Sequence, residues 1–319
     1  MITGENDKGR RLDRVLRKAL ADHPLPLIHR LLRQKKVLVN GKPAKAGDRL
    51  DCGDVVRIPS LKDKHAPKPA SAARGLPSPA VIWEGAGLLA VNKPSGLAVH
   101  GPTDCGAGPY SLDEMVNCYL AEKLPPSLSF KSGPLHRLDK PSSGIVVFSA
   151  SLDGARLFSS LLRERKVKKT YLAIVEGTIL NEEIWQDELF RDSEKKKTFV
   201  SQPAAKAVAA KTAAASAACE KTAGKAAITK VKPLLNNGNY TLITAEIATG
   251  RTHQIRAQAA FHGHPLYGDK KYGGRGRRRG FFLHAWKLEF LEHSIEAPLP
   301  QAFREKAMEL FGAERFALP

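Results

Sequence analysis

The sequence predicts an α+β protein with two domains. Short runs rich in β-branched residues and bounded by turn residues, such as Ile145-Val146-Val147-Phe148, predict strands. Other stretches, such as residues 153–165, have apolar residues at helical spacing. Residues 60–79 are rich in Pro, Ala, Lys and Ser and have no periodic apolar pattern. We therefore expect a small domain over residues 1–59, a flexible linker over 60–79 that lets it swing, and a larger domain over 80–319.

Composition excludes several classes of protein. The chain has 319 residues, 42% of them hydrophobic, which is enough for a substantial core. No apolar run approaches the roughly 18 residues of a membrane helix, and the N-terminus has no signal-peptide pattern. The four cysteines are scattered without CxxC pairing, so neither zinc nor a disulfide framework is indicated. We expect a soluble, cytoplasmic protein.

The charge balance indicates a polyanionic partner. There are 51 Lys and Arg residues against 32 Asp and Glu residues, which leaves a net charge of +19. Without a membrane-binding amphipathic helix to account for it, such an excess favours nucleic acid. A soluble protein that is merely basic remains the alternative.

The N-terminal unit predicts two helices and short strands with one basic face. The first helix begins near Arg10 and ends at Pro24 and Pro26, and the second begins near Leu27. Residues 37–41 form a strand that runs into an Asn-Gly turn, and residues 53–58 form another strand. Cations at helical spacing can follow RNA phosphates. The candidates are Arg14, Arg30, Arg33, Lys35 and Lys36. An ordinary solvated helix face is the alternative.

The larger domain alternates predicted strands and helices. Residues 204–227 are dominated by Ala and Lys and have little apolar bulk, so we interpret them as an exposed, partly ordered insertion. Residues 273–280 place four arginines among glycines and suit phosphate binding or a solvated loop. The expected strands are 80–84, 88–92, 145–148, a strand through Tyr171, 229–235 and 240–247, and the expected helices are 112–124, 153–165 and 302–311.

One dense polar stretch, His136 to Gly144, precedes the strand at 145–148. Its Asp139 lies beside Arg137 and Lys140, and a carboxylate next to fixed positive charge stays ionised, which suits a nucleophile. A helix cap, a turn residue or half of a structural ion pair would be the plainer interpretation. A second polar stretch, Gly250 to Arg256, also follows a predicted strand, and two such clusters exceed the needs of one turn.

These stretches resemble the motifs of the RluA-like pseudouridine synthases. His136-Arg137-Leu138-Asp139 followed by Ser142-Ser143-Gly144 resembles their central HRLDxxTSG motif, and Gly250 to Arg256 resembles GRTHQIR. Three further stretches fit the same family, namely 92–100, 169–177 and 263–269. Residues 9–59 resemble the S4 RNA-binding domain. The sequence departs from the pattern at Ser142, which replaces Thr but keeps the hydroxyl, and at Gln258, where His is common.

The resemblance implies a mixed, largely antiparallel sheet with the active cleft across its face. It also implies isomerisation of uridine to pseudouridine in RNA, without metal or cofactor. Asp139 would be the nucleophile, and Arg251 would hold it by a bidentate pair. Tyr171 would stack on the uracil and assist proton removal at C5. Ile255 would pack beside the base, and Arg137 would fill the space that the flipped uridine leaves. His136 and His253 would shape loops.

Structured RNA is the expected substrate, and the S4-like domain favours large-subunit ribosomal RNA over transfer RNA. We expect the protein to be a monomer. A non-catalytic RNA-binding assembly factor remains an alternative. So does another enzyme with an Asp nucleophile, such as a glycosidase, which would need a second carboxylate as acid.

Overall fold

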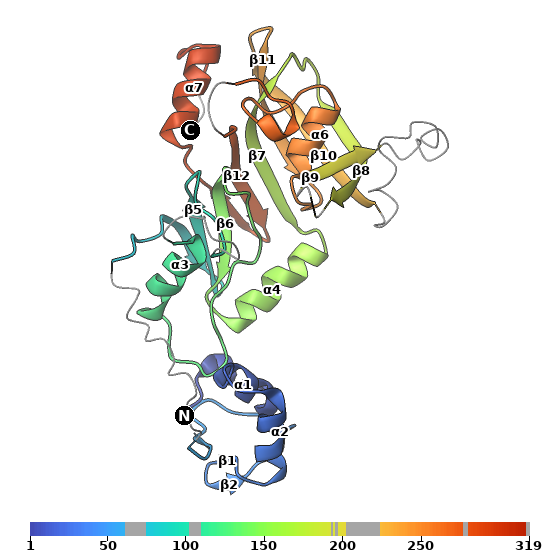
Figure 1. Ribbon diagram of the computed structural model, residues 1–319. Coiled ribbons are helices and arrows are strands. Elements are labelled where there is room, and N and C mark those ends of the chain that lie inside the picture. Colours follow the sequence, from blue (N-terminus) through green and yellow to red (C-terminus); the bar gives the residue numbers. More distant parts are fainter. Residues whose placement is uncertain are drawn as a thin grey trace.

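The computed structural model describes residues 1–60, 75–101, 110–192, 194, 197–201, 224–276 and 280–316. Most of the expected linker and of the Ala/Lys-rich insertion lies outside these ranges. The N-terminal unit lies at one end of a larger domain that is built on one long sheet (Figure 1).

The N-terminal unit has the predicted helices and a small antiparallel sheet. The Asn40-Gly41 turn is confirmed: both residues have positive φ, 50° and 80°, as a tight hairpin turn requires. Pro26, which we expected to end the first helix, instead lies in the first turn of the second, where its missing N–H costs nothing. The elements are η1 (Glu5–Asp7), α1 (Leu12–Ala19), α2 (Leu25–Arg33), β1 (Leu38–Val39), β2 (Lys42–Pro43) and β3 (Val56–Arg57).

The larger domain is built on a ten-stranded sheet with the order β4-β5-β6-β12-β7-β11-β10-β8-β9, and β13 pairs with β12. Only β6 and β12 pair in parallel within the described residues, so the expectation of a mixed, largely antiparallel sheet is confirmed. The strands are β4 (Val81–Gly85), β5 (Leu88–Lys93), β6 (Ser143–Ser149), β7 (Val167–Glu176), β8 (Glu183–Asp192), β9 (Lys197–Ser201), β10 (Lys225–Asn236), β11 (Tyr240–Ile247), β12 (Leu283–Phe290) and β13 (His293–Glu296).

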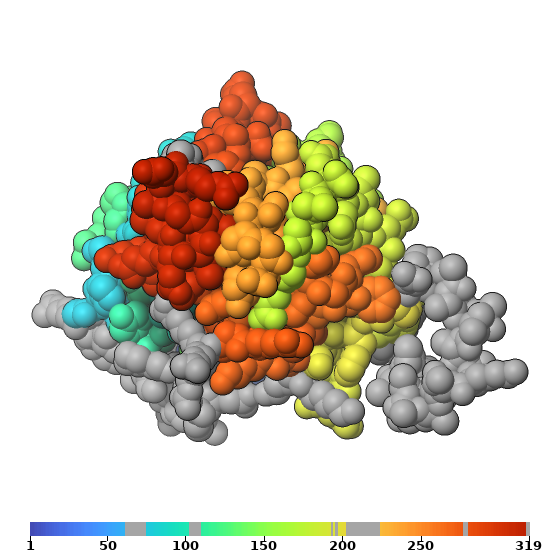
Figure 2. All heavy atoms as spheres, turned by 90° about the horizontal axis from the view of Figure 1, so that it is seen from above, coloured from blue at the N-terminus to red at the C-terminus, as the bar shows by residue number. Residues whose placement is uncertain are grey.

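Helices cover both faces of this sheet because side chains alternate between the faces. On one face, α3 (Leu112–Ala121) and α6 (Gln254–Phe261) share a core with Val146 and Tyr171. On the other face, α4 (Leu152–Arg163) packs on Val147, and α7 (Gln301–Phe311) packs on Leu172. Figure 2 shows the C-terminal helix, in red, against the orange and yellow-green strands. A short helix, η5 (Lys270–Tyr272), follows α6.

Gly144 explains how the central motif meets the sheet. Its φ is +108°, and a Cβ at this position would lie 2.3 Å from the backbone oxygen of Ala285 on β12. Only glycine allows β6 to start this close to β12. The Asp139 loop is therefore anchored in the middle of the sheet.

Two expectations about the chain's organisation need correction. Residues 225–227, assigned to the insertion, belong to β10 and pair with β8. The N-terminal unit, which we expected to swing, is hydrogen-bonded to the larger domain: the buried carboxylate of Asp7 accepts from Ser127 and from the backbone of Leu128. A flexible linker permits motion, but these contacts oppose it.

Among the described residues, no helix is both long and apolar enough to cross a membrane.

Candidate active site

A cavity of about 550 Å³ opens beside Asp139. The loop before β6 supplies Arg137 and Asp139, and β7 supplies Tyr171. The loop between β11 and α6 closes the cavity with Arg251 and His253. The structure therefore brings the two polar stretches of the sequence together in one site, although they are more than 100 residues apart.

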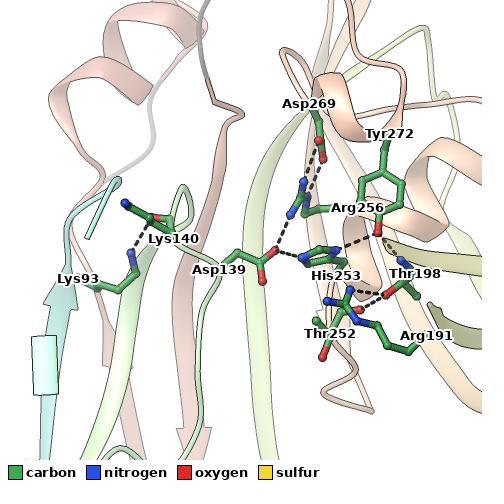
Figure 3. A network of polar contacts seen from close by, with 10 residues as sticks. All are labelled: Lys93, Asp139, Lys140, Arg191, Thr198, Thr252, His253, Arg256, Asp269 and Tyr272. Carbon is green, nitrogen blue, oxygen red and sulfur yellow. Dashed lines mark hydrogen bonds and ion pairs between the residues drawn. The ribbon is translucent and has the colours of Figure 1, made fainter. Parts of the chain in front are cut away.

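Arg256 is the partner of Asp139 (Figure 3). Its Nη1 donates to Oδ2 of Asp139 at 2.8 Å, and its Nε and Nη2 donate to the two oxygens of Asp269 at 2.7 and 2.9 Å. The side chain of Asp269 is 2% exposed and that of Asp139 is 21% exposed. Burial alone would lower the pKa of Arg256, but the hydrogen bonds and charges of the two carboxylates raise it. A permanent guanidinium thus joins a buried acid to an accessible one.

The prediction that Arg251 holds Asp139 is wrong. Arg251 is exposed at the mouth of the cavity, and its Nε donates to the backbone oxygen of Ala226 at 3.4 Å. The cause is the start of α6: Arg251 precedes the helix, whereas Arg256 is in its first turn. Side chains on a helix tilt toward its N-terminus, so Arg256 reaches back to Asp139. The sequence signal was present, because both arginines belong to the same motif.

Aromatic rings and His253 enclose the ion pair. The guanidinium of Arg256 lies 4.2 Å from the ring centroid of Phe281 and 5.1 Å from that of Tyr272. Nδ1 of His253 is 2.9 Å from the hydroxyl of Tyr272, and its Nε2 is 3.7 Å from Oδ2 of Asp139. Burial lowers the pKa of His253 to about 4, against the opposing charge of Asp139. His253 is therefore neutral near pH 7, and its contacts join the loop to Tyr272 and Asp139.

The β8–β9 hairpin, which we did not predict, supports this loop from behind. The hydroxyl of Thr198 on β9 donates to the backbone oxygen of Thr252 at 2.9 Å, and its N–H donates to the hydroxyl of Tyr272 at 2.9 Å. Arg191 on β8 reaches the same hydroxyl of Thr198 at 3.4 Å. The hairpin thus fixes the position of His253.

Buried Lys93 fastens the Asp139 loop to the end of β5. Its Nζ donates to the backbone oxygens of Pro94, Leu97 and Lys140 at 2.9, 2.7 and 3.1 Å. Burial lowers the pKa of Lys93 to about 7, although the charge of Asp139 acts in the opposite direction. The three protons of this ammonium group thus tie the segment after β5 to the Asp139 loop, where the backbone oxygen of Lys140 also accepts the N–H of Gly96 at 2.8 Å.

Of the expected base-contacting residues, Arg137 and Tyr171 line the cavity, and Ile255 lines a smaller pocket that shares Asp139 and Tyr171 with it. Tyr171 is 7% exposed, and burial together with the charge of Asp139 raises the pKa of its phenol. Ile255 is buried beside it. Arg137 is exposed at the rim. Among the described residues, the cavity lining thus combines apolar side chains, the carboxylate of Asp139 and several cations.

More cations line the mouth than the motifs indicate. The cavity lining also includes Arg163, the last residue of α4, Arg165 just after it, and Lys169 on β7. Burial lowers the pKa of Lys169 to about 8. In the N-terminal unit, all five predicted RNA contacts, Arg14, Arg30, Arg33, Lys35 and Lys36, are exposed.

His136 and Gln258 both have structural positions. Nε2 of His136 accepts the N–H of Val147 at 3.1 Å, and burial lowers the pKa of His136 to about 3. Gln258 is fully buried and donates to Asp187 at 2.6 Å. The departure from the usual His therefore changes a buried network behind the site.

Comparison with solved structures identifies the fold as that of the RNA pseudouridylate synthases. The structure titled "Human RNA Pseudouridylate Synthase Domain Containing 4" matches with a TM-score of 0.55, covering 76% of this chain and 95% of that one at 20% identity. "Human RNA Pseudouridylate Synthase Domain Containing 1" matches with a TM-score of 0.53 over 71% of this chain and 84% of that one, at 21% identity.

Comparison of sequences gives the family. The family described as "RNA pseudouridylate synthase" matches residues 87–261, more than half of the chain, and the S4 domain matches residues 10–56. "Ribosomal large subunit pseudouridine synthase C" of Vibrio vulnificus is 31% identical over 92% of this chain and 89% of its own length. The protein of the same name from Escherichia coli is 30% identical over 97% and 95%. The chain belongs to the RNA pseudouridylate synthase family, which are isomerases that act on RNA.

Proposed function

We propose that the protein converts uridine to pseudouridine in large-subunit ribosomal RNA, with Asp139 as the nucleophile. The observation that carries this proposal is the ion pair between buried Arg256 and Asp139, which lines a basic cavity together with Tyr171. The names of the relatives and the presence of the S4 domain support a ribosomal substrate. Such a protein would act as a monomer in the cytoplasm.

The reaction keeps all atoms within one nucleotide. The bond from N1 to C1′ breaks, the uracil turns, and C5 bonds to C1′ while the C5 proton leaves. Oδ2 of Asp139 accepts from Arg256, and among the described residues Oδ1 has no hydrogen bond, so Oδ1 is the oxygen that faces the ribose. The ordinary pKa of a tyrosine is already well above 7, and that of Tyr171 is raised further, so its phenol carries a proton near pH 7. We therefore assign it stacking and hydrogen bonding to the base.

The mouth of the cavity suits an extruded nucleotide. A stacked uridine must leave the helix at a cost of a few kcal/mol. Arg137, exposed at the rim, would fill the vacated space, and Ile255, which lines the smaller pocket beside Tyr171, would pack beside the flipped base. Arg251 contributes charge toward the phosphates.

The competing enzyme class finds little support in this site. A glycosidase needs a second carboxylate near the first. Among the described residues that line the cavity, Asp139 is the only acid. Asp269 cannot serve as the second carboxylate, because it is buried and both of its oxygens are bound to Arg256. An assembly factor without activity would have no need for an accessible carboxylate held by a buried arginine.

The test is release of tritium from RNA labelled at uridine C5. Unmodified ribosomal RNA and transfer RNA are each incubated with wild type, Asp139→Ala and Asp139→Asn. Release from ribosomal RNA by wild type alone is the expected result, and mapping then locates the uridine. Release from transfer RNA only would retain the chemistry and reject the substrate. Tight binding without release from either RNA would favour the assembly factor.

A further inference from the structure

The N-terminal unit is attached to the larger domain through one buried carboxylate. Asp7 is 0% exposed. Its Oδ2 accepts the N–H groups of Gly4 and Leu128, both at 2.9 Å, and its Oδ1 accepts the hydroxyls of Ser127 and Ser129. Burial would raise the pKa of Asp7, but these hydrogen bonds lower it. One carboxylate of the N-terminal unit thus accepts four hydrogen bonds, three of them from the larger domain.

Neighbouring contacts extend the same junction. Nη1 of Arg10 donates to the hydroxyl of Ser129 at 2.5 Å, and Oδ1 of Asn6 accepts the N–H of Leu152 at 2.8 Å. Leu128 packs on the core of the N-terminal unit. A Cβ on Gly4 would lie 2.1 Å from the backbone oxygen of Pro126, so the approach is close. The interface is specific and packed.

The junction contacts two segments that lead to the active site. Residues 127–129 precede the Asp139 loop in the chain, and Leu152 is the first residue of α4. The opposite end of α4 supplies Arg163 to the cavity. With 12 residues at 1.5 Å each, α4 spans about 18 Å. This helix therefore sets a fixed spacing between the N-terminal unit and the site (Figure 1).

The exposed face of α4 carries arginines along this span. Arg156 and Arg163 are seven residues apart, so they lie on the same side of the helix, opposite the buried Phe158. At the other end, Arg156 and Arg14 are both close enough to Arg10 to lower its pKa, after burial, which has the largest effect. Arg156 pairs with Asp153 at 3.0 Å, but both are exposed, so the pair is easily exchanged for a phosphate.

We propose that Arg14, Arg156, Arg163 and Arg165 form one RNA-backbone track along α4, and that Asp7 is the positioning residue that holds the two ends of this track in line. The inference rests on the proposed function and deepens it. The ligand is a structured RNA whose helical segment lies on the N-terminal unit at a fixed distance from the modified uridine. A rigid junction makes the second contact intramolecular, which raises affinity for RNAs of the correct geometry.

The track is tested with Arg156, which does not line the cavity. Binding of long ribosomal RNA and of a short stem-loop containing the mapped uridine is measured by filter retention at several salt concentrations. Arg156→Glu should weaken binding of the long RNA about three- to tenfold and reduce the salt slope by about one. Lys230→Glu is the matched control, since Lys230 is also an exposed cation paired with an acid. Equal effects of both variants would overturn the track.

The positioning role of Asp7 is tested from both sides of the junction. Asp7→Ala, and separately the double variant Ser127→Ala/Ser129→Ala, which leaves the N-terminal unit unaltered, should speed hydrogen exchange at the N–H of Leu128. Each should lower kcat/KM on long RNA relative to the stem-loop by about tenfold. Asp22→Ala, an exposed acid on the same unit, is the control. An unchanged ratio with fast exchange would overturn the positioning role.

These outcomes are separable from the proposed function. If wild type releases no tritium from either RNA, the isomerase proposal fails. The binding measurements still decide whether RNA follows the arginines along α4, and the exchange measurements still decide whether Asp7 holds the junction closed.

Discussion

Asp269 and Asp139 are linked by Arg256, which hydrogen-bonds to both carboxylates. It binds two nitrogens of that guanidinium from a site that is 2% exposed, so the third nitrogen can point only at Asp139. Because the guanidinium is planar, its two bonds to buried Asp269 fix the direction in which it donates to the accessible carboxylate of Asp139. The carboxylate that reacts and the carboxylate that orients are therefore parts of one network.

We expect Asp269→Asn to reduce kcat strongly and to change KM little. The amide cannot neutralise Arg256, which would be left buried with one carboxylate partner, and breaking such a pair costs about 3–5 kcal/mol of stability. Single-turnover tritium release should slow by about 100-fold, a typical effect of misplacing a reacting group. Glu182→Gln, an exposed acid, is the control and should change neither the rate nor the melting temperature. A normal rate in Asp269→Asn would remove the orienting role.

The two arginines of the same motif should respond differently to lysine. Arg256→Lys keeps the charge but cannot bind Asp269 twice and Asp139 once, so we expect kcat to fall by about 100-fold or more. Arg251→Lys keeps the positive charge at the mouth of the cavity, so we expect kcat to fall by less than about threefold. The comparison uses tritium release with both variants at saturating RNA. The reverse order of severity would restore the assignment that the sequence suggested.

Much of the fold was legible from the sequence because its core strands have strong local signals. β11 begins and ends at the predicted residues, Tyr240 and Ile247, and α4 is one residue longer at its start and two shorter at its end than expected. α6 was missed because six consecutive residues, Gln254 to Ala259, are all buried, so no polar face marks the helix. The β8–β9 hairpin was also missed, since its alternation includes many charged residues.

The site was predicted less completely than the fold. Motif positions identified Asp139, Tyr171 and the loop containing Arg251, and all three line one cavity. Which arginine contacts Asp139 depends on where α6 begins, and the spacing of residues does not reveal this. The attachment through Asp7 was not visible either, because it pairs residues about 120 positions apart and depends on packing between domains.

Buried His284 should make the protein less stable in acid. Its Nδ1 lies 2.9 Å from the hydroxyl of Ser143 and its Nε2 lies 3.1 Å from the backbone oxygen of Ala297, which joins the start of β6 to β12. Burial lowers the pKa of His284 from 6.5 to about 4. Between these values the unfolded chain binds a proton that the folded chain does not. The contribution of His284 to the free energy of unfolding is therefore complete above pH 6.5 and is lost as pH falls toward 4.

We expect this residue alone to contribute a slope of about 1.4 kcal/mol per pH unit to the free energy of unfolding in that range. His284→Gln keeps a donor for Ala297 but cannot titrate. It should lower stability at pH 7.5 by about 1–3 kcal/mol through the lost bond to Ser143, and it should flatten the slope between pH 4 and 6.5 by one proton. Urea unfolding across this range measures both quantities. His29→Gln, at an exposed position on α2, is the control and should leave the slope unchanged. A His284→Gln variant with the wild-type slope would show that other histidines with lowered pKa values, such as His136 and His253, account for the sensitivity to acid.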